Sequence, residues 1–171
     1  GVYNEQVNSL YGLAELGYKD LVYLNLTGRK DWFSVLNPQN NSSFYPSVSG
    51  SFIFSELLRD VSWLDYGKLR GSYADVGSSN GINAFSGLLT YGILQNPFNG
   101  YPLGNINNTN SPNPLLRPFS VSEKEIGIEL KLFKSRVNLD VAYYDKQTRD
   151  QILTVVVSNA SGYNGTPLNL G

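Results

Sequence analysis

Apolar and polar residues alternate along several stretches of this chain, which is the pattern of a β-strand, because successive side chains on a strand face opposite sides. In residues 21–30, Val22, Leu24 and Leu26 fall on one side and mostly polar residues on the other. Three further stretches alternate as clearly: 47–55, 125–132 and 137–146. Two alternate less regularly, 10–18 and 67–76, and the apolar stretch 152–157 does not alternate. The pattern predicts an all-β protein with six or seven antiparallel strands.

The connections between these strands are predicted to differ strongly in length. Two are short, at residues 18–20 and 133–135, and two are long, at 31–46 and 77–122. An intermediate connection covers 56–66, and another long one follows the last strand. If consecutive strands pair antiparallel, the long connections all fall at one end of the sheet. This asymmetry is typical of outer-membrane β-barrels, which have short periplasmic turns and long outer loops.

Strands with one apolar face fit two environments, a soluble sandwich or a membrane barrel whose polar face lines a wet lumen. Strand length near that of a tilted membrane strand favours the barrel. Aromatic residues near strand ends, which suit the membrane interface, favour it too: Tyr18, Phe54, Trp63, Tyr66, Tyr73, Tyr143 and Tyr144. A soluble secreted β-sandwich that binds carbohydrate through loop aromatics is the alternative. A barrel acting as a passive channel or adhesin is a third hypothesis.

Composition removes several classes of function. The 171 residues include 13 basic and 14 acidic side chains and no His or Cys, which excludes zinc fingers, disulfides, haem ligation and Ser–His–Asp catalysis. The near-neutral balance argues against a nucleic-acid partner. The 19 Asn and 19 Ser, together 38 residues, favour turns and loops. No run approaches the roughly 18 apolar residues of a membrane helix. We expect no enzyme activity, cofactor or metal site.

Closure of the sheet sets a further expectation. Six or seven strands are fewer than the roughly eight of the smallest bacterial outer-membrane barrels. An open sheet in lipid leaves unpaired backbone groups at both edges, each at a cost of several kcal/mol. We therefore expect residues 1–171 to be a contiguous wedge of a larger barrel, and residues 167–171 to begin a further strand.

The amino-acid sequence of several segments resembles that of the central barrel of SusC/RagA-type TonB-dependent outer-membrane transporters. The blocks occur in the family's order over nearly the whole chain: Tyr18-Lys19-Asp20, Leu26-Thr27-Gly28-Arg29-Lys30-Asp31, Phe44-Tyr45-Pro46-Ser47-Val48-Ser49, Lys68-Leu69-Arg70-Gly71-Ser72-Tyr73, Val76-Gly77-Ser78-Ser79-Asn80, Asn113-Pro114-Leu115-Leu116-Arg117-Pro118, Glu123-Lys124-Glu125-Ile126-Gly127, Asp140-Val141-Ala142-Tyr143-Tyr144-Asp145-Lys146 and Ser161-Gly162-Tyr163. Two segments depart from it, Phe52-Ile53-Phe54 and Asp31-Trp32-Phe33. We expect these to alter loop contacts and specificity, not the fold.

The resemblance implies a 22-stranded transmembrane barrel in the bacterial outer membrane, with an N-terminal plug domain inside it. TonB would act on a periplasmic segment to remodel the plug, and a SusD-like surface lipoprotein would cap the barrel. The cargo would be an oligosaccharide or a peptide, and the outer wall would contact membrane lipid. We expect the plug and the TonB-contacting segment to lie outside residues 1–171.

Transport requires no covalent chemistry, so the candidate site residues are those that cargo could meet. Strand parity predicts a lumen-facing set: Tyr23, Asn25, Thr27, Arg29, Lys68, Arg70, Glu129, Lys131, Asp140, Tyr144 and Lys146. The long loop adds three aromatic candidates for contact with sugar rings or the capping lipoprotein: Tyr91, Phe98 and Tyr101.

Overall fold

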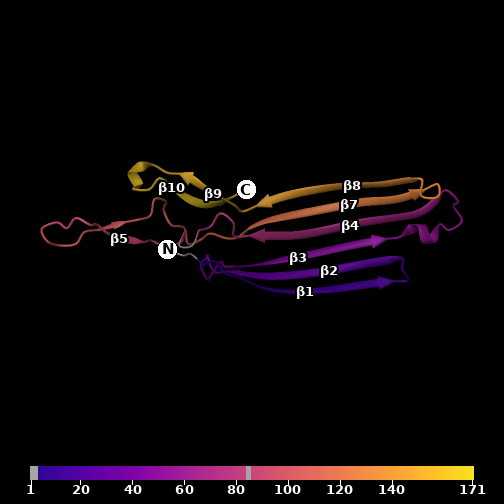
Figure 1. Ribbon diagram of the computed structural model, residues 1–171, viewed down its shortest axis with the longest axis horizontal. Coiled ribbons are helices and arrows are strands. Elements are labelled where there is room, and N and C mark those ends of the chain that lie inside the picture. The colour runs from indigo at the N-terminus through magenta and orange to yellow at the C-terminus, as the bar shows by residue number, and fades with distance from the viewer. Residues whose placement is uncertain (1–3, 84–85) are drawn as a thin grey trace.

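A computed structural model describes residues 4–83 and 86–171. Six long strands form one antiparallel sheet in the order β1-β2-β3-β4-β7-β8 (Figure 1). Their bounds are Val7–Tyr18 for β1, Val22–Phe33 for β2, Ser42–Phe52 for β3, Leu64–Ser78 for β4, Phe119–Leu132 for β7 and Val137–Arg149 for β8. Neighbours in this sheet are also neighbours in sequence, apart from an insertion between β4 and β7. The predicted antiparallel all-β fold is confirmed.

The connections divide the sheet into a turn end and a loop end. At the turn end, β1–β2 and β7–β8 are joined by tight turns in which Lys19, Asp20 and residues 133–135 adopt positive φ. The β3–β4 connection at the same end contains a short 3-10 helix, η1 (Phe54–Leu57). At the loop end lie residues 34–41, residues 79–118 and the chain after β8 (Figure 1). The predicted separation of short and long connections is confirmed.

Several predicted boundaries were wrong because strands continue further than their alternation. β2 runs to Phe33 and β3 begins at Ser42, so the connection predicted over 31–46 spans only 34–41. β7 begins at Phe119, which shortens the long loop to 79–118. Phe54 was predicted in a strand but opens η1, where its ring packs over Gly67; a Cβ there would clash with it. Backbone pairing with a neighbour, not side-chain pattern, sets these ends.

Two small sheets lie at the loop end. Strands β5 (Tyr91–Ile93) and β6 (Gly104–Ile106) pair within the long loop, and this hairpin projects beyond the main sheet (Figure 1). Strand β9 (Gln151–Val156) pairs with β10 (Gly165–Leu170), with the short 3-10 helix η2 (Asn159–Ser161) between them. The predicted seventh strand, residues 152–157, is thus a strand of this separate hairpin rather than a member of the main sheet.

Buried apolar side chains are few and gather at the loop end. Phe33, Leu36, Ile82 and Leu116 form one cluster, which joins the end of β2 to the long loop. Within the described residues no second layer packs on the six-stranded sheet. Val22 and Leu139, which a sandwich would bury, are 41% and 45% exposed. The sandwich alternative is therefore not the architecture of these residues. No helix in residues 4–83 or 86–171 is long and apolar enough to cross a membrane.

Candidate functional site: the polar face of the sheet

The strand register assigns each side chain of the six strands to one of two faces. Tyr23 lies opposite Ser51, Ser51 opposite Arg70, and Lys68 opposite Glu129, so these positions share one face. Glu129 in turn lies opposite Asp140, which extends this face to β8. All eleven residues predicted from parity to share a face do so. We call it the polar face, and the opposite one the apolar face.

The apolar face is uncharged over most of its length. On β2, β4, β7 and β8, four successive positions of this face carry no charge: Val22 to Gly28, Gly67 to Tyr73, Ile126 to Leu132 and Val137 to Tyr143. Charge begins only at the next position toward the loop end, with Lys30, Asp75, Lys124 and Asp145. Each uncharged stretch is about 20 Å long at roughly 3.3 Å per residue. The limit is reached at a similar point on all four strands.

The aromatic residues predicted to form an interfacial belt do not all lie on the apolar face. Tyr18, Tyr73 and Tyr143 do, and Trp63, in the β3–β4 connection, is 52% exposed. Tyr66 pairs with Lys131 and Tyr144 with Glu125, which places both on the polar face. For these two the belt prediction was wrong, because proximity to a strand end does not determine the face.

Arg70 is the centre of an ion-pair network on the polar face. Its Nη2 lies 3.2 Å from Oδ1 of Asp140, two strands away, and its Nε lies 3.3 Å from Oε1 of Glu125. The contact with Glu125 is ionic only, because the Nε–H is not aimed at the carboxylate. The side chain crosses β7 directly above Gly127, where a Cβ would lie 2.6 Å from Nε. Glycine at this position is what lets Arg70 link β4, β7 and β8.

Two more ion pairs join directly opposite residues of this face. Lys68 Nζ lies 3.5 Å from Glu129 Oε2, and Lys146 Nζ lies 3.9 Å from Glu123 Oε2. The ammonium group of Lys131 lies 5.4 Å from the ring centroid of Tyr66, a cation–π geometry. Opposite charges facing one another across strands stabilise the pairing modestly, and their mutual compensation leaves β4, β7 and β8 with a polar but balanced surface.

Beside this network the polar face is hollowed. A cavity of about 210 Å³ is lined by Asn25, Ser49, Ser51 and Ser72, together with Lys68, Arg70 and Glu125. Small side chains on β2 and β3 leave the space, while charged side chains from β4 and β7 border it. The site thus offers hydroxyl, amide and charged groups from four strands to one ligand.

A second hollow, of about 450 Å³, lies nearer the loop end and is lined in part by Thr27, Arg29 and Tyr45. Thr27 and Ser47 share a hydrogen bond of 2.5 Å between their hydroxyl oxygens. The Arg29 guanidinium lies 5.5 Å from the centroid of Tyr45 and 3.0 Å from the buried carboxylate of Asp31. These contacts hold the Arg29 side chain against the sheet.

Of the eleven candidates, Arg70 and Asp140 belong to the ion-pair network. Lys68 and Glu129 form a separate pair, and Lys146 pairs with Glu123. Tyr144, on the outermost strand β8, is 65% exposed and lies apart from both hollows. Sequence reasoning missed Tyr45, Glu123 and Glu125. The two glutamates share the parity of Glu129, and this signal could have found them; Tyr45 lay inside a predicted loop, so its strand position gave no signal.

The three aromatic candidates of the long loop lie on the projecting hairpin. Tyr91 begins β5, and Phe98 and Tyr101 bridge each other across the Asn99-Gly100 turn, where both residues have positive φ. All three rings are at least 66% exposed. They are therefore available to a partner or ligand, but the fold does not gather them into a cavity.

Known proteins are similar in sequence to this chain along nearly its whole length. Residues 1–171 match the family described as "TonB dependent receptor-like, beta-barrel". The chain is 30% identical to TonB-dependent receptor P26 and 26% identical to TonB-dependent receptor P39, both of Formosa agariphila. The alignments cover 97% and 96% of this chain but only 17% and 16% of those relatives. The chain thus spans about one sixth of the length of the curated relatives it matches.

Solved structures show the same fold. A structure of the RagAB peptide importer in the "closed-closed" state matches 96% of this chain and 18% of its own, with a TM-score of 0.85 at 22% identity. The siderophore receptor PirA from Pseudomonas aeruginosa matches 97% of this chain and 29% of its own, with a TM-score of 0.61 at 15% identity. These findings confirm the resemblance to the SusC/RagA-type barrel, and the chain belongs to the TonB-dependent receptor β-barrel family.

Proposed function

We propose that residues 1–171 form a sector of the wall and outer loops of an active transporter in the bacterial outer membrane. The observation that carries the proposal is the contrast between the two faces. The apolar face is bare and uncharged over about 20 Å on four strands, close to the apolar band of roughly 25 Å in outer-membrane barrels. The polar face carries paired charges and hollows, as a wet lumen does. A soluble protein seldom leaves so large an apolar surface uncovered.

In this proposal the edge strands β1 and β8 each pair with a further strand of the same barrel. The barrel closes at 22 strands around a plug domain. TonB supplies energy through the plug, and a SusD-like surface lipoprotein lies over the loop end. The cargo is an oligosaccharide or a peptide, and it passes along the polar face. Family membership and the likeness to RagAB and PirA support this assignment. Lys68, Arg70 and the adjoining hollow are the proposed cargo contacts.

Cysteine labelling in intact outer membranes tests the topology. These residues contain no native Cys, so each introduced thiol is unique within them. In the longer polypeptide that contains this chain, we expect Asn25→Cys and Ser49→Cys to react with a small membrane-impermeant maleimide entering through the lumen. The matched apolar-face variants Leu24→Cys and Val48→Cys should stay protected until detergent is added. Equal labelling of both pairs in membranes would show that the apolar face does not meet lipid.

A transport assay tests the energy coupling. Cells that express the longer polypeptide should accumulate its cargo only when TonB is present and the inner membrane is energised. Deletion of TonB should reduce uptake to the background of cells without the transporter. Uptake that survives this deletion contradicts active transport and favours a passive channel.

A further inference from the structure

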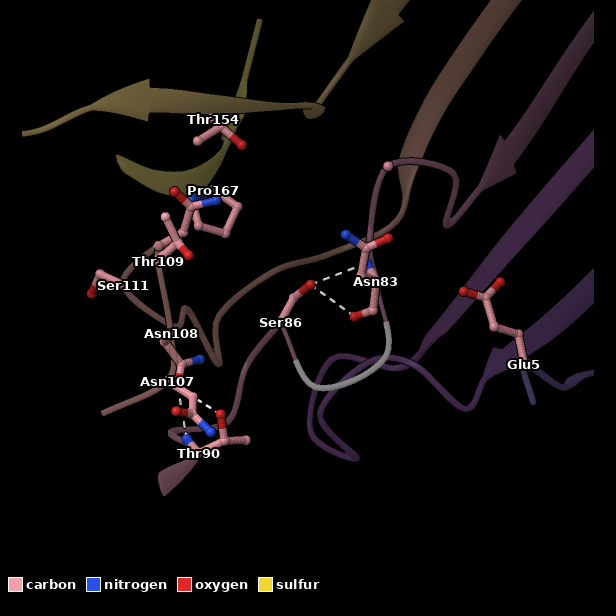
Figure 2. Close-up of a pocket in the computed structure, with 12 residues that line it drawn as sticks. Glu5, Asn83, Ser86, Thr90, Asn107, Asn108, Thr109, Ser111, Thr154 and Pro167 are labelled. Carbon is pink, nitrogen blue, oxygen red and sulfur yellow. Dashed lines mark hydrogen bonds between the residues drawn. The ribbon is translucent and has the colours of Figure 1, made fainter. Parts of the chain in front are cut away.

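A third cavity, at the loop end, lies outside the polar face. It measures about 580 Å³ and is bounded by the long loop, the β9–β10 hairpin and the N-terminal segment at Glu5 (Figure 2). Most of its lining residues carry a neutral amide or hydroxyl: Asn83, Ser86, Thr90, Asn107, Asn108, Thr109, Asn110, Ser111 and Thr154. Glu5 is the one ionisable residue among the twelve that line it. Such a cavity presents many neutral hydrogen-bonding groups to a ligand and a single charged one.

Backbone-to-backbone hydrogen bonds hold the wall of this cavity in place and do not use its side chains. The N–H of Asn107 donates to the Thr90 carbonyl at 3.0 Å, and the Asn164 N–H donates to the Thr109 carbonyl at 2.9 Å. The Ser111 N–H donates to the Gly165 carbonyl at 2.8 Å. These contacts tie residues 107–111 to both neighbouring segments. The wall is therefore held in place by its main chain.

The asparagine side chains of the wall divide into two roles. The Asn108 amide is held by three hydrogen bonds, since its oxygen accepts from the N–H and hydroxyl of Thr90 and its nitrogen donates to the Leu88 carbonyl. Within the described residues, the side chains of Asn107, Thr109 and Asn110 have no hydrogen-bond partner. Their amides and hydroxyl remain available, and each can both donate and accept.

The lack of charge extends through the long loop as far as Leu116. Residues 76–116 include no Asp, Glu, Lys or Arg, although charged residues make up 16% of the chain. A charged ligand that loses water in this cavity would find one carboxylate and no cation to compensate it, which is costly. A neutral ligand rich in hydroxyl groups meets no such penalty, because each hydroxyl can pair with an amide or hydroxyl of the wall.

We propose that this cavity is a binding site for an uncharged saccharide, with Asn107, Thr109 and Asn110 as hydrogen-bonding contacts and the Glu5 carboxylate as an acceptor for a sugar hydroxyl. The site selects neutral sugars over acidic sugars and over peptides with charged groups. This inference rests on the proposed transporter, because it names the class of cargo taken up at the loop end. The proposed ligand differs in class from that of the RagAB neighbour, which is a peptide importer.

Calorimetry with defined probes tests the site. The longer polypeptide, purified in detergent, is titrated with neutral hexasaccharides of glucose, mannose and xylose, with hexagalacturonate, and with a decapeptide carrying charged side chains. At least one neutral hexasaccharide should bind at least tenfold more tightly than hexagalacturonate or the peptide. Stronger binding of either charged probe, or no binding of any neutral one, overturns the proposal.

Variants locate the binding. Asn107→Leu and Thr109→Val should each weaken binding of the preferred hexasaccharide by about fivefold, the effect of one lost hydrogen bond. Asn159→Leu, at the same end of the molecule but outside the cavity, is the matched control and should keep wild-type affinity. Wild-type affinity in both cavity variants overturns the site. If uptake of that sugar still requires TonB, only the site is wrong; if uptake is independent of TonB, the transporter proposal fails, whatever binds in the cavity.

Discussion

The two faces of the six-stranded sheet are built by the same strands, residue by alternate residue, yet they differ in how their side chains are stabilised. On the polar face, Arg70, Lys68 and Lys146 each find a carboxylate on a neighbouring strand. On the apolar face, side chains such as Leu16, Ile126 and Val141 are 60%, 55% and 51% exposed, with no partner layer above them in the described residues.

One face is therefore complete within the described residues, and the other is not. The ion pairs and hydrogen bonds of the polar face form between β4, β7 and β8 themselves. This face is therefore stable in contact with water without a further partner. The apolar face gains its stabilisation only from an environment that residues 4–83 and 86–171 do not supply. Lipid is the environment that membership of a membrane-barrel family implies for the apolar face. A charged residue introduced on each face in turn tests whether the two faces differ in environment.

A charge on the apolar face should destabilise the protein more than any other substitution considered below. Leu24→Arg places a cation at the middle of the uncharged stretch of β2, where a midplane arginine in an outer-membrane barrel costs roughly 2–4 kcal/mol. Asn25→Arg, one residue away on the polar face, is the matched control and should cost well under half as much. Reversible unfolding of the longer polypeptide in lipid vesicles measures both. Equal costs for the two variants would mean that the faces do not differ in environment.

Replacing the glycine that Arg70 crosses should have an intermediate effect on stability. Gly127→Val puts a side chain where Arg70 crosses β7, so the guanidinium must leave Asp140 and Glu125. The expected loss is about 1 kcal/mol of unfolding free energy, since these groups are partly exposed and water screens them. Gly12→Val on β1, where a Cβ meets nothing within 4 Å, should be neutral or slightly stabilising.

A structure of the variant separates this cause from general crowding. Displacement of Arg70 with the strands unmoved is the expected outcome, and addition of Arg70→Gln to Gly127→Val should then cost little more. If the two substitutions are instead additive, the arginine is not what Gly127 accommodates.

The strands and the two faces could be predicted from the sequence because alternation is a local signal that the sheet preserves. All eleven candidates on the polar face followed from parity alone. Their grouping did not, since Arg70 meets Asp140 only after β7 has placed Gly127 between them. The cluster of Phe33, Leu36, Ile82 and Leu116 was equally hidden, because its members come from three separate connections or strand ends. Contacts of that kind depend on how loops fold back, which no periodicity encodes.

Single ion pairs should contribute least to the stability of the sheet. A double-mutant cycle with Lys68→Met and Glu129→Gln should give a coupling energy of about 0.5 kcal/mol, because both side chains are less than one-third exposed. The same cycle on Arg59 and Glu56, whose pair lies in the β3–β4 connection with side chains 78% and 43% exposed, should give a value near zero. Raising the salt concentration should reduce the first coupling, since dissolved ions screen partly exposed charges on the polar face. If the connection pair couples as strongly as the pair on the sheet, strand pairing contributes nothing to the strength of these contacts, and the order of the polar face has another source.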